Sequence, residues 1–281
     1  QGYICAVGGG SEDYNNWSDA PYGWIVEKSD SGKIIILGAD AGVTNWLPTY
    51  FMSLGADTAY NKTISSKTIA DLQVTYDEIV TAKAVFIRGG DQWDYVSRWK
   101  GTKTDSAIQF VFNNGGVIAG TSAGAAAASE NMLFNGDYHG FIKGEVKHSK
   151  GFGFVDDMVI DTHFLNRERI PRLLQMLAMG AENKAIGLDE DTSIFIDKND
   201  FFEVFGSGMV TLLNAEEMTY NDFHEIQENQ AYNVNNVKIG FLSRGAKFNL
   251  KPWIVVQPQQ TVIKDNQFIY DQHLIGPGAY I

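Results

Sequence analysis

The sequence predicts an α/β protein built on a mostly parallel β-sheet with helices on both faces. Over about the first two thirds of the 281 residues, short apolar runs alternate with longer segments of helical periodicity. From Ser193 onward the pattern changes to closely spaced strands joined by short turns, such as the one at Lys198-Asn199-Asp200. Alternation of the first kind is typical of βαβ units, and the second pattern predicts an antiparallel C-terminal extension packed on the same core.

The strands of the parallel part are predicted from runs of apolar and β-branched residues, as expected for strands buried on both faces. In chain order these runs are Tyr3–Val7, Lys33–Leu37, Ala84–Arg88, Val117–Ala119, Met158–Asp161 and Ala185–Leu188. Helical periodicity lies between them, at Asn45–Leu54, Thr68–Thr81, Trp93–Trp99, Thr104–Asn113 and Ile170–Met179. These connections are long enough to cross over between parallel strands.

The antiparallel extension is predicted from four further runs, at Ser193–Asp197, Phe201–Phe205, Met209–Leu213 and Val237–Leu242. No linker rich in proline, glycine or serine interrupts the chain, so residues 1–250 are expected to form a single α/β domain. Residues 251–281 contain three of the six prolines and have weak periodicity. We expect them to form a C-terminal tail packed on that domain or appended to it.

Composition excludes several classes of function. The formal net charge of −12 argues against nucleic acid or an anionic membrane surface as a partner. No apolar stretch approaches the length of a membrane span. The chain begins at Gln1 rather than at methionine, which slightly favours a secreted or periplasmic protein over a cytoplasmic one.

Cysteine and histidine usage points away from metals and disulfides. Cys5 is the only cysteine, so neither an internal disulfide nor a zinc site made of cysteines is possible, and its apolar run predicts a buried thiol. No cluster of histidine, aspartate and glutamate has the spacing of metal ligands. We therefore expect neither a metal nor an organic cofactor.

A candidate nucleophile lies in Gly120–Gly124, which fits the G-x-S-x-G pattern of a nucleophile elbow around Ser122. A buried strand precedes it, and an alanine run with high helix propensity follows it. A sharp turn between the two would expose the serine above the sheet, and the flanking glycines would allow close backbone approach. A plain glycine-rich turn is the alternative interpretation.

The candidate base is His163, because it follows the predicted strand that ends at Asp161. In open α/β sheets, ligands bind at the carboxyl ends of the strands, where Ser122 is also expected. The candidate acid is Glu190, which follows another predicted core strand. A carboxylate there would fix the imidazole tautomer and stabilise the imidazolium. Asp137 and Asp189 remain competitors for this role, and a solvated acidic turn is the structural alternative.

Two further groups could complete a serine site. The backbone N–H groups of Ala123 and of the Gly89-Gly90 pair could form an oxyanion hole, and Gln92 could bind a substrate carboxylate or amide. Three arginines follow the candidate base, at Arg167, Arg169 and Arg172. Such a cluster could bind a carboxylate bidentately, or it could form surface salt bridges. Asp161 could hold a substrate amine or one of these arginines.

Taken together, these segments resemble the cyanophycinases, which belong to the serine peptidase family that also contains the aspartyl dipeptidases. The resemblance lies in several spaced motifs over roughly residues 3 to 250: Gly8–Asp13, Phe86–Gln92, Gly120–Ala125, Asp161–Arg172, Gly187–Glu190, Gly206–Val210 and Phe241–Leu250. The block that runs from Asp161 to Arg172, with the pattern D-x-H-F-x-x-R-x-R-x-x-R, is the most specific of them.

The resemblance implies a three-layer αβα fold like that of the class I glutamine amidotransferases. It implies Ser122 as nucleophile, His163 as base and Glu190 as the third member of the triad. It also implies that the side chains around the substrate's aspartyl group are Gln92, Asp161, Arg167, Arg169 and Arg172. The reaction expected from it is release of β-aspartyl-arginine dipeptides from cyanophycin, and a homodimer is a further expectation.

Three alternatives remain at this point. The leaving group could be one other than arginine, as in an aspartyl or isoaspartyl dipeptidase. An ordinary α/β-hydrolase would carry its base late in the chain, at His224 or His273, but the order Ser122, His163, Glu190 argues against it. A binding protein without turnover would be expected to lack the nucleophile or the base, and both are present.

Overall fold

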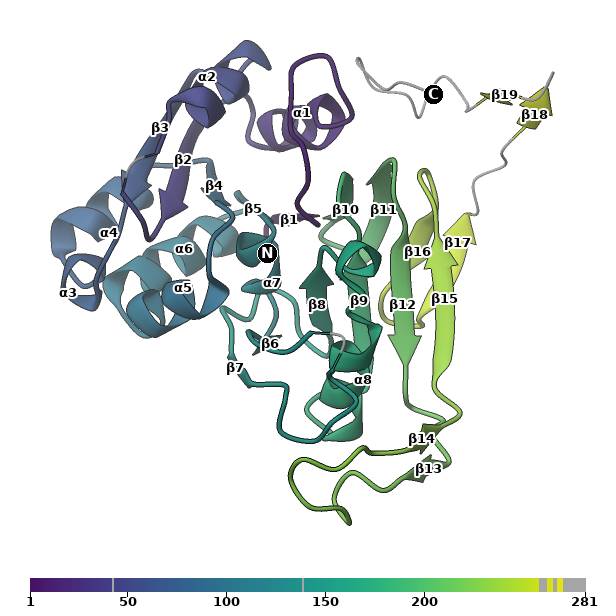
Figure 1. Cartoon of the computed structure of the whole chain (residues 1–281). Helices are drawn as coiled ribbons and strands as arrows, with labels where there is room; N and C mark the ends of the chain where they lie inside the picture. The colour runs from purple at the N-terminus through teal and green to yellow at the C-terminus, as the bar shows by residue number, and fades with distance from the viewer. Residues whose placement is uncertain (42, 138, 258–261, 265–266, 270–281) are drawn as a thin grey trace.

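The computed structural model describes residues 1–41, 43–137, 139–257, 262–264 and 267–269, and its strands form two main β-sheets with helices packed against them (Figure 1). The larger sheet has nine strands, which in spatial order are β17 (Ile254–Gln257), β16 (Lys247–Asn249), β11 (Phe201–Gly206), β10 (Thr192–Ile196), β1 (Tyr3–Val7), β5 (Val117–Thr121), β4 (Ala84–Ile87), β2 (Lys33–Gly38) and β3 (Thr58–Thr63). The smaller sheet has four, which are β15 (Lys238–Leu242), β12 (Val210–Asn214), β9 (Lys184–Leu188) and β8 (Val159–Thr162).

The remaining strands pair in twos: β6 (Asn131–Leu133) with β7 (His148–Lys150), β13 (Tyr220–Asn221) with β14 (Val234–Asn235), and β18 (Val262–Lys264) with β19 (Gln267–Ile269). The helices are α1 (Asp19–Lys28), α2 (Trp46–Ser53), α3 (Lys67–Ala70), α4 (Gln73–Ile79), α5 (Gln92–Trp99), α6 (Lys103–Asn113), α7 (Ala123–Ala126) and α8 (Ile170–Ala178), with a 3₁₀ turn at Leu165–Arg167.

Both sheets are mixed. Strands β1, β5, β4, β2 and β3 pair in parallel, whereas β10, β11, β16 and β17 are added to the edge of β1 in antiparallel pairings. In the smaller sheet β8 and β9 are parallel, and β12 and β15 extend it in antiparallel pairings. The prediction of one mostly parallel sheet therefore holds for β1, β5, β4, β2 and β3 of the larger sheet. Strand β10 occupies the edge of β1 that β5 leaves free. Strands β8 and β9 therefore cannot pair with β1, and they form a second sheet instead.

Each face of the larger sheet has its own apolar core. Helices α1 and α2 cover one face, where Tyr22 and Phe51 pack with Phe86 of β4 and with the buried thiol of Cys5. The other face is covered by α3 to α6 and by the smaller sheet, whose Ile186 joins the same cluster. Helix α8 packs on the outer face of the smaller sheet, through Leu173, Met176 and Leu177. Burial raises the pKa of the Cys5 thiol well above its ordinary value, so this thiol is a packing group.

Within the first 113 residues, the elements differ from the predicted ones in three places. Helix α1 and strand β3 were not predicted, because α1 contains Pro21 and Gly23 and β3 is largely polar. The predicted helix Thr68–Thr81 is two helices, since Leu72 between them has an extended backbone with φ −74° and ψ 139°.

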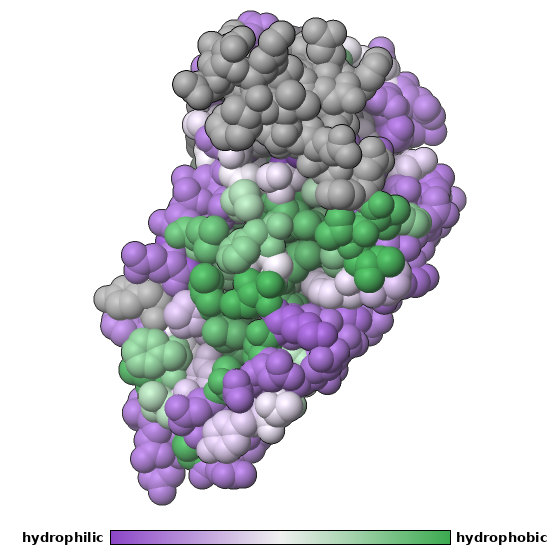
Figure 2. All heavy atoms as spheres, turned by 90° about the vertical axis from the view of Figure 1, so that its right-hand side faces the viewer, coloured by the Kyte–Doolittle hydropathy of each residue, from purple (hydrophilic) through white to green (hydrophobic). Residues whose placement is uncertain are grey.

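The predicted tail begins as part of the fold, because β17 pairs with β16 at the edge of the larger sheet. Of the rest of that tail, the structure describes only β18 and β19, and Pro258, His273 and Pro277 lie outside the described residues. Apolar side chains are exposed near the free edges of the two sheets (Figure 2): Ile239, Phe241, Ile254, Val255 and Val256. No helix in the described part of the chain is long and apolar enough to cross a membrane.

Candidate active site

The candidate site residues follow strands of both sheets, at the carboxyl ends of those strands. Ser122 comes directly after β5, His163 directly after β8, and Glu190 two residues after the end of β9. Gly8 follows β1, and Gly89 lies two residues after the end of β4. Because β8 and β9 belong to the smaller sheet, the site lies where the two sheets meet.

Ser122 has the strained backbone of a nucleophile elbow, with φ 53° and ψ −117°. Its N–H donates to the carbonyl of Val7 at 2.9 Å, which ties the turn to the neighbouring strand. Glycine is required on both sides of it. A Cβ on Gly120 would lie 2.5 Å from the carbonyl carbon of Gly124, and one on Gly124 would lie 2.1 Å from the carbonyl oxygen of Ile87.

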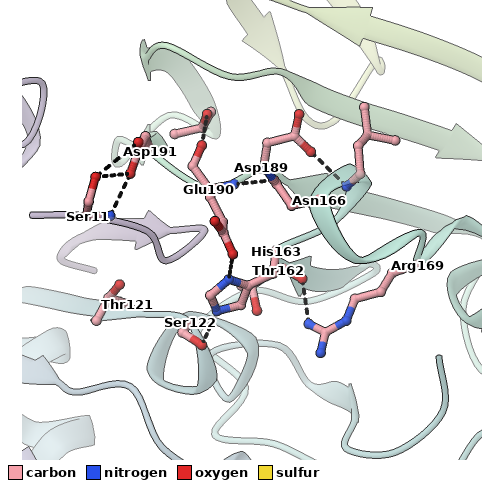
Figure 3. A network of polar contacts seen from close by, with 12 residues as sticks. Ser11, Thr121, Ser122, Thr162, His163, Asn166, Arg169, Asp189, Glu190 and Asp191 are labelled. Carbon is pink, nitrogen blue, oxygen red and sulfur yellow. Dashed lines mark hydrogen bonds and ion pairs between the residues drawn. The ribbon is translucent and has the colours of Figure 1, made fainter.

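Three side chains form a continuous chain of hydrogen bonds (Figure 3). The Oγ of Ser122 lies 2.7 Å from Nε2 of His163, and the other ring nitrogen, Nδ1, lies 2.7 Å from Oε1 of Glu190. A carboxylate can only accept, so the Glu190 contact places the ring proton on Nδ1 and leaves Nε2 to accept from the serine hydroxyl. The arrangement can therefore take a proton from Ser122.

The three candidates for the third member of the triad, Glu190, Asp189 and Asp137, have different partners in the structure. Glu190 reaches His163, whereas Asp189 is buried and accepts from the backbone N–H groups of Leu165 and Met209 at 2.9 and 3.2 Å. Asp137 is exposed and accepts from the N–H of His139 at 2.8 Å. The structure thus brings Glu190, and neither of its two competitors, to the imidazole.

The electrostatic setting lowers the pKa of His163 below its ordinary value of 6.5. Desolvation of the buried ring is the largest cause, and the positive charges of Arg167 and Arg169 act in the same direction. The hydrogen bond and negative charge of Glu190 oppose them. The ring is therefore neutral at neutral pH, as a general base must be.

The glycine-rich loop after β1 holds these segments together through its backbone. The carbonyl of Gly8 accepts from the N–H of His163 at 2.9 Å, and that of Gly9 accepts from the N–H of Asp191 at 2.8 Å. The N–H of Ser11 in turn donates to the Asp191 carboxylate at 2.7 Å (Figure 3). Gly9 lies directly against the imidazole, because a Cβ on it would be 2.3 Å from Cε1 of the ring.

The arginines after His163 have three different environments. Arg172 is buried and forms a bidentate pair with the fully buried Asp161, and its third donor bonds the carbonyl of Gly136 at 2.7 Å. The prediction is that Asp161 and Arg172 contact the substrate, but in this structure each side chain is enclosed and paired with the other. Of the two roles considered for Asp161, the structure supports the one in which it holds an arginine.

Arg169 lies beside Asp161, with a terminal nitrogen 3.8 Å from the carboxylate, and Figure 3 shows it next to Thr162. One of its terminal nitrogens donates to the carbonyl of Thr162 at 2.7 Å, and only 16% of its side chain is exposed. Burial and the neighbouring arginines lower its pKa to about 10, so it still carries a charge at neutral pH. Arg167 is exposed beside it. These two arginines therefore remain available to a bound anion.

The predicted oxyanion donors lie next to the nucleophile. Ala123 follows Ser122 in the elbow, and Gly89 packs against Ser122, since a Cβ on this glycine would lie 3.6 Å from that of the serine. Among the described residues, neither the Ala123 N–H nor the Gly90 N–H has a backbone acceptor. Gln92 is half-buried and its amide donates to the carbonyl of Leu133 at 3.0 Å, so its nitrogen is used in holding β6.

Other candidate groups lie elsewhere. His148 and His224 are exposed, and His273 lies outside the described residues. Within the described part of the chain, no group of three or more histidine, cysteine, aspartate or glutamate side chains is placed to hold a metal ion.

Sequence reasoning missed several residues that support the site. Glu12 accepts from the hydroxyls of Thr121 and Tyr22, at 3.1 and 2.9 Å, and so ties the residue before the nucleophile to α1. Asn166 accepts from the N–H of Glu190 at 2.9 Å. The glycine run before Glu12 was a usable signal for this loop, whereas the Asn166 contact depends on a tertiary turn that leaves no local pattern.

The chain is similar to known peptidases. The family model described as Peptidase family S51 matches residues 49–204, which is more than half of the chain. A cyanophycinase of Geminocystis herdmanii is 32% identical over 184 residues, covering 63% of this chain and 66% of that protein. One of Trichormus variabilis is 28% identical over 211 residues, covering 71% of this chain and 68% of that protein.

The match to the Geminocystis protein thus spans just under two thirds of its length. Among solved structures, a peptidase from an acI-B1 Actinobacterium superposes with a TM-score of 0.63 at 17% identity, covering 89% of this chain and 97% of that one. At this identity the likeness supports the α/β fold alone. The extent of the family match carries the assignment, and the chain belongs to peptidase family S51.

Proposed function

We propose that this protein is a serine exopeptidase that hydrolyses β-aspartyl linkages, and that its substrate is cyanophycin, from which it releases β-aspartyl-arginine dipeptides. One observation carries the catalytic part of this proposal, the hydrogen-bonded chain from Ser122 through His163 to Glu190. The substrate class is supported by the two relatives whose names are cyanophycinase.

The proposed reaction is acyl transfer through a serine ester. His163 Nε2 takes the hydroxyl proton as the Oγ of Ser122 attacks the scissile carbonyl, and Glu190 stabilises the imidazolium that forms. When the C–N bond breaks, the imidazolium gives its proton to the departing amine. A water molecule, deprotonated by the same nitrogen, then attacks the ester, and the proton returns to Ser122 as the acid product leaves.

The oxyanion of each tetrahedral intermediate would be bound by the N–H groups of Ala123 and Gly90. Ala123 follows Ser122 and Gly90 follows Gly89, which packs against Ser122, and neither donor has a backbone acceptor among the described residues. Donors that are already oriented need not reorganise as charge develops, which is why such groups lower the barrier. Removing one such donor in other enzymes costs about 10²-fold to 10³-fold in kcat.

The substrate carboxylate would be bound by Arg169 and Arg167, the two arginines left available after Arg172 pairs with Asp161. A guanidinium binds a carboxylate through two parallel hydrogen bonds, which suits the free carboxyl of an aspartyl residue. The net charge of −12 would favour approach of a polymer that carries arginine side chains. Gln92 is proposed to contact the same substrate through its amide oxygen, since its amide nitrogen bonds Leu133.

The test is an assay of the purified protein on cyanophycin, on β-aspartyl-arginine peptides, and on β-aspartyl-lysine and β-aspartyl-leucine as matched controls for the leaving group. Release of β-aspartyl-arginine from the polymer is the expected result. Equal rates on all three dipeptides without release from the polymer would instead indicate an isoaspartyl dipeptidase. No hydrolysis of any β-aspartyl substrate would overturn the proposal.

Replacing Gly9 with alanine is expected to lower kcat by about 10²-fold, the cost of misplacing reacting groups by about 1 Å. The new Cβ would lie 2.3 Å from the His163 ring, and φ at this position is +94°, so the imidazole must move. Steady-state kinetics on a β-aspartyl peptide measures the effect. Gly23→Ala on α1 is the control, because a Cβ there meets open space. Equal kcat in the two variants would contradict the packing described.

The pH profile of kcat/KM is expected to rise through the pKa of His163 with a midpoint below 6.5, since only the neutral ring accepts a proton. Glu190→Gln should move this midpoint to still lower pH, because Glu190 raises the pKa of the ring. The same change should lower the high-pH plateau by about 10²-fold or more, since the imidazolium loses its partner.

Asp137→Asn is the matched control for this profile. Asp137 contacts His139, whereas Glu190 contacts His163. The pH profile of kcat/KM of the Asp137→Asn variant should therefore equal that of the unmodified protein. A midpoint that moves with Asp137→Asn and stays fixed with Glu190→Gln would assign the acid to the other carboxylate.

A further inference from the structure

The peptide group that joins Gly89 to Gly90 is held from one side by the hydroxyl of Tyr95. This hydroxyl donates to the carbonyl oxygen of Gly89 at 2.8 Å. The described residues contain no cis peptide bond, so the N–H of Gly90 points away from the carbonyl of Gly89 and from the tyrosine. Ser122 packs against this turn, since a Cβ on Gly89 would be 3.6 Å from its own Cβ.

Gly90 could not be replaced by another residue without losing this arrangement. Its φ is +153°, and a Cβ on it would lie 2.6 Å from the hydroxyl oxygen of Tyr95. The tyrosine hydroxyl therefore occupies the space that a side chain would need. The Tyr95 contact and the glycine that makes room for it thus meet at the same peptide group.

Tyr95 is itself rigid. It lies on α5, is 1% exposed, and stacks on Trp99 with ring centroids 4.8 Å apart. Trp99 is fully buried, and its indole N–H donates to the carbonyl of Ile64 at 2.8 Å. Desolvation raises the pKa of Tyr95 far above the neutral range, so its hydroxyl keeps its proton as a donor. Because Tyr95 is held both by burial and by stacking on Trp99, its hydroxyl can fix the position of a backbone group.

We propose that Tyr95 is a positioning residue for the oxyanion hole, which orients the Gly90 N–H by binding the carbonyl of the preceding residue. This inference rests on the acyl-transfer function proposed above and deepens it. The hydroxyl of Tyr95 bonds the carbonyl of Gly89, and the proposed role acts through that peptide group. Without the hydroxyl, the peptide group between Gly89 and Gly90 loses the hydrogen-bond donor that favours this orientation over the flipped one.

Tyr95→Phe tests this role, because it removes the hydroxyl and keeps the ring stacked on Trp99. We expect kcat for a β-aspartyl peptide to fall about 10-fold with KM changed less than about 2-fold, since the donor serves the transition state. The rate at which a fluorophosphonate labels Ser122 should fall by a similar factor. The pH midpoint of labelling should not change, because the surroundings of His163 are untouched.

Tyr232→Phe is the matched control. Tyr232 is also a buried tyrosine whose hydroxyl donates to a backbone carbonyl, that of Pro171 at 3.1 Å. Its loss should lower the unfolding temperature about as much as the loss of the Tyr95 hydroxyl and leave kcat unchanged. Unchanged kcat and labelling rate in Tyr95→Phe, or an equal loss of kcat in both variants, would overturn the inference.

The labelling rate separates this inference from the proposed substrate. If the unmodified protein is labelled at Ser122 but hydrolyses no β-aspartyl peptide, the proposed substrate class fails and Tyr95→Phe is still judged by its labelling rate. If the unmodified protein is not labelled, Ser122 is not an activated nucleophile, and both proposals are overturned.

Discussion

Ser122→Ala is expected to lower kcat for β-aspartyl peptide hydrolysis by at least about 10⁴-fold, because no other group can form the ester with the acyl part of the substrate. Part of the remaining rate would come from the oxyanion donors and from substrate binding, which the alanine leaves intact. The measurement is single-turnover release of product, combined with mass spectrometry for the acyl-enzyme.

The matched control for this change is Ser53→Ala at the end of α2, an exposed serine whose hydroxyl bonds the carbonyl of Tyr50. Its activity should equal that of the unmodified protein. Retention of more than about a tenth of the activity in Ser122→Ala would exclude the elbow serine as the nucleophile. Full activity in His163→Ala would instead require a base elsewhere.

Arg172→Met is expected to lower the free energy of unfolding by about 3 to 5 kcal/mol, the cost of leaving a buried charge without its partner. Asp161 is fully buried, and its two carboxylate oxygens both accept from Arg172. The loss should appear as a lower midpoint in urea unfolding monitored by circular dichroism.

Two further variants sharpen this test. Lys238→Met, which breaks the exposed pair with Glu217, should change the midpoint much less, because water already screens those charges. Adding Asp161→Leu to Arg172→Met should recover part of the loss, since it removes the stranded carboxylate. If Arg172→Met unfolds with the midpoint of the unmodified protein, the buried pair does not stabilise the fold.

The elements with the strongest local signals were predicted correctly, and those that depend on distant contacts were not. The apolar runs at β1, β2 and β5 are buried on both faces, so their sequence alone identifies them. Among the described strands, β3 pairs only with β2, and its polar residues give no such signal. Assignment of β8 and β9 to a second sheet depends on β10 competing for the edge of β1, which no local pattern reveals.

The candidate site shows the same division. The sequence could predict that Ser122 and His163 lie close together, because each follows a strand and the carboxyl ends of such strands are where ligands bind. The choice of Glu190 over its neighbours depends on a turn in which Asp191 has a φ of 54° and binds Ser11. The pairing of Arg172 with Asp161 depends on the angle at which α8 crosses the smaller sheet. Neither can be read from residue type and spacing.

The loop after β1 has a consequence for motion in the site. The carbonyl groups of Gly8 and Gly9 accept from the amides of His163 and Asp191, which follow different strands. If this loop opens, both amides lose their acceptors together, and so we expect them to exchange with deuterium at one common rate. An opening that exposes these amides also separates the nucleophile from its base. The common exchange rate therefore measures how often the catalytic site opens while the sheets stay folded.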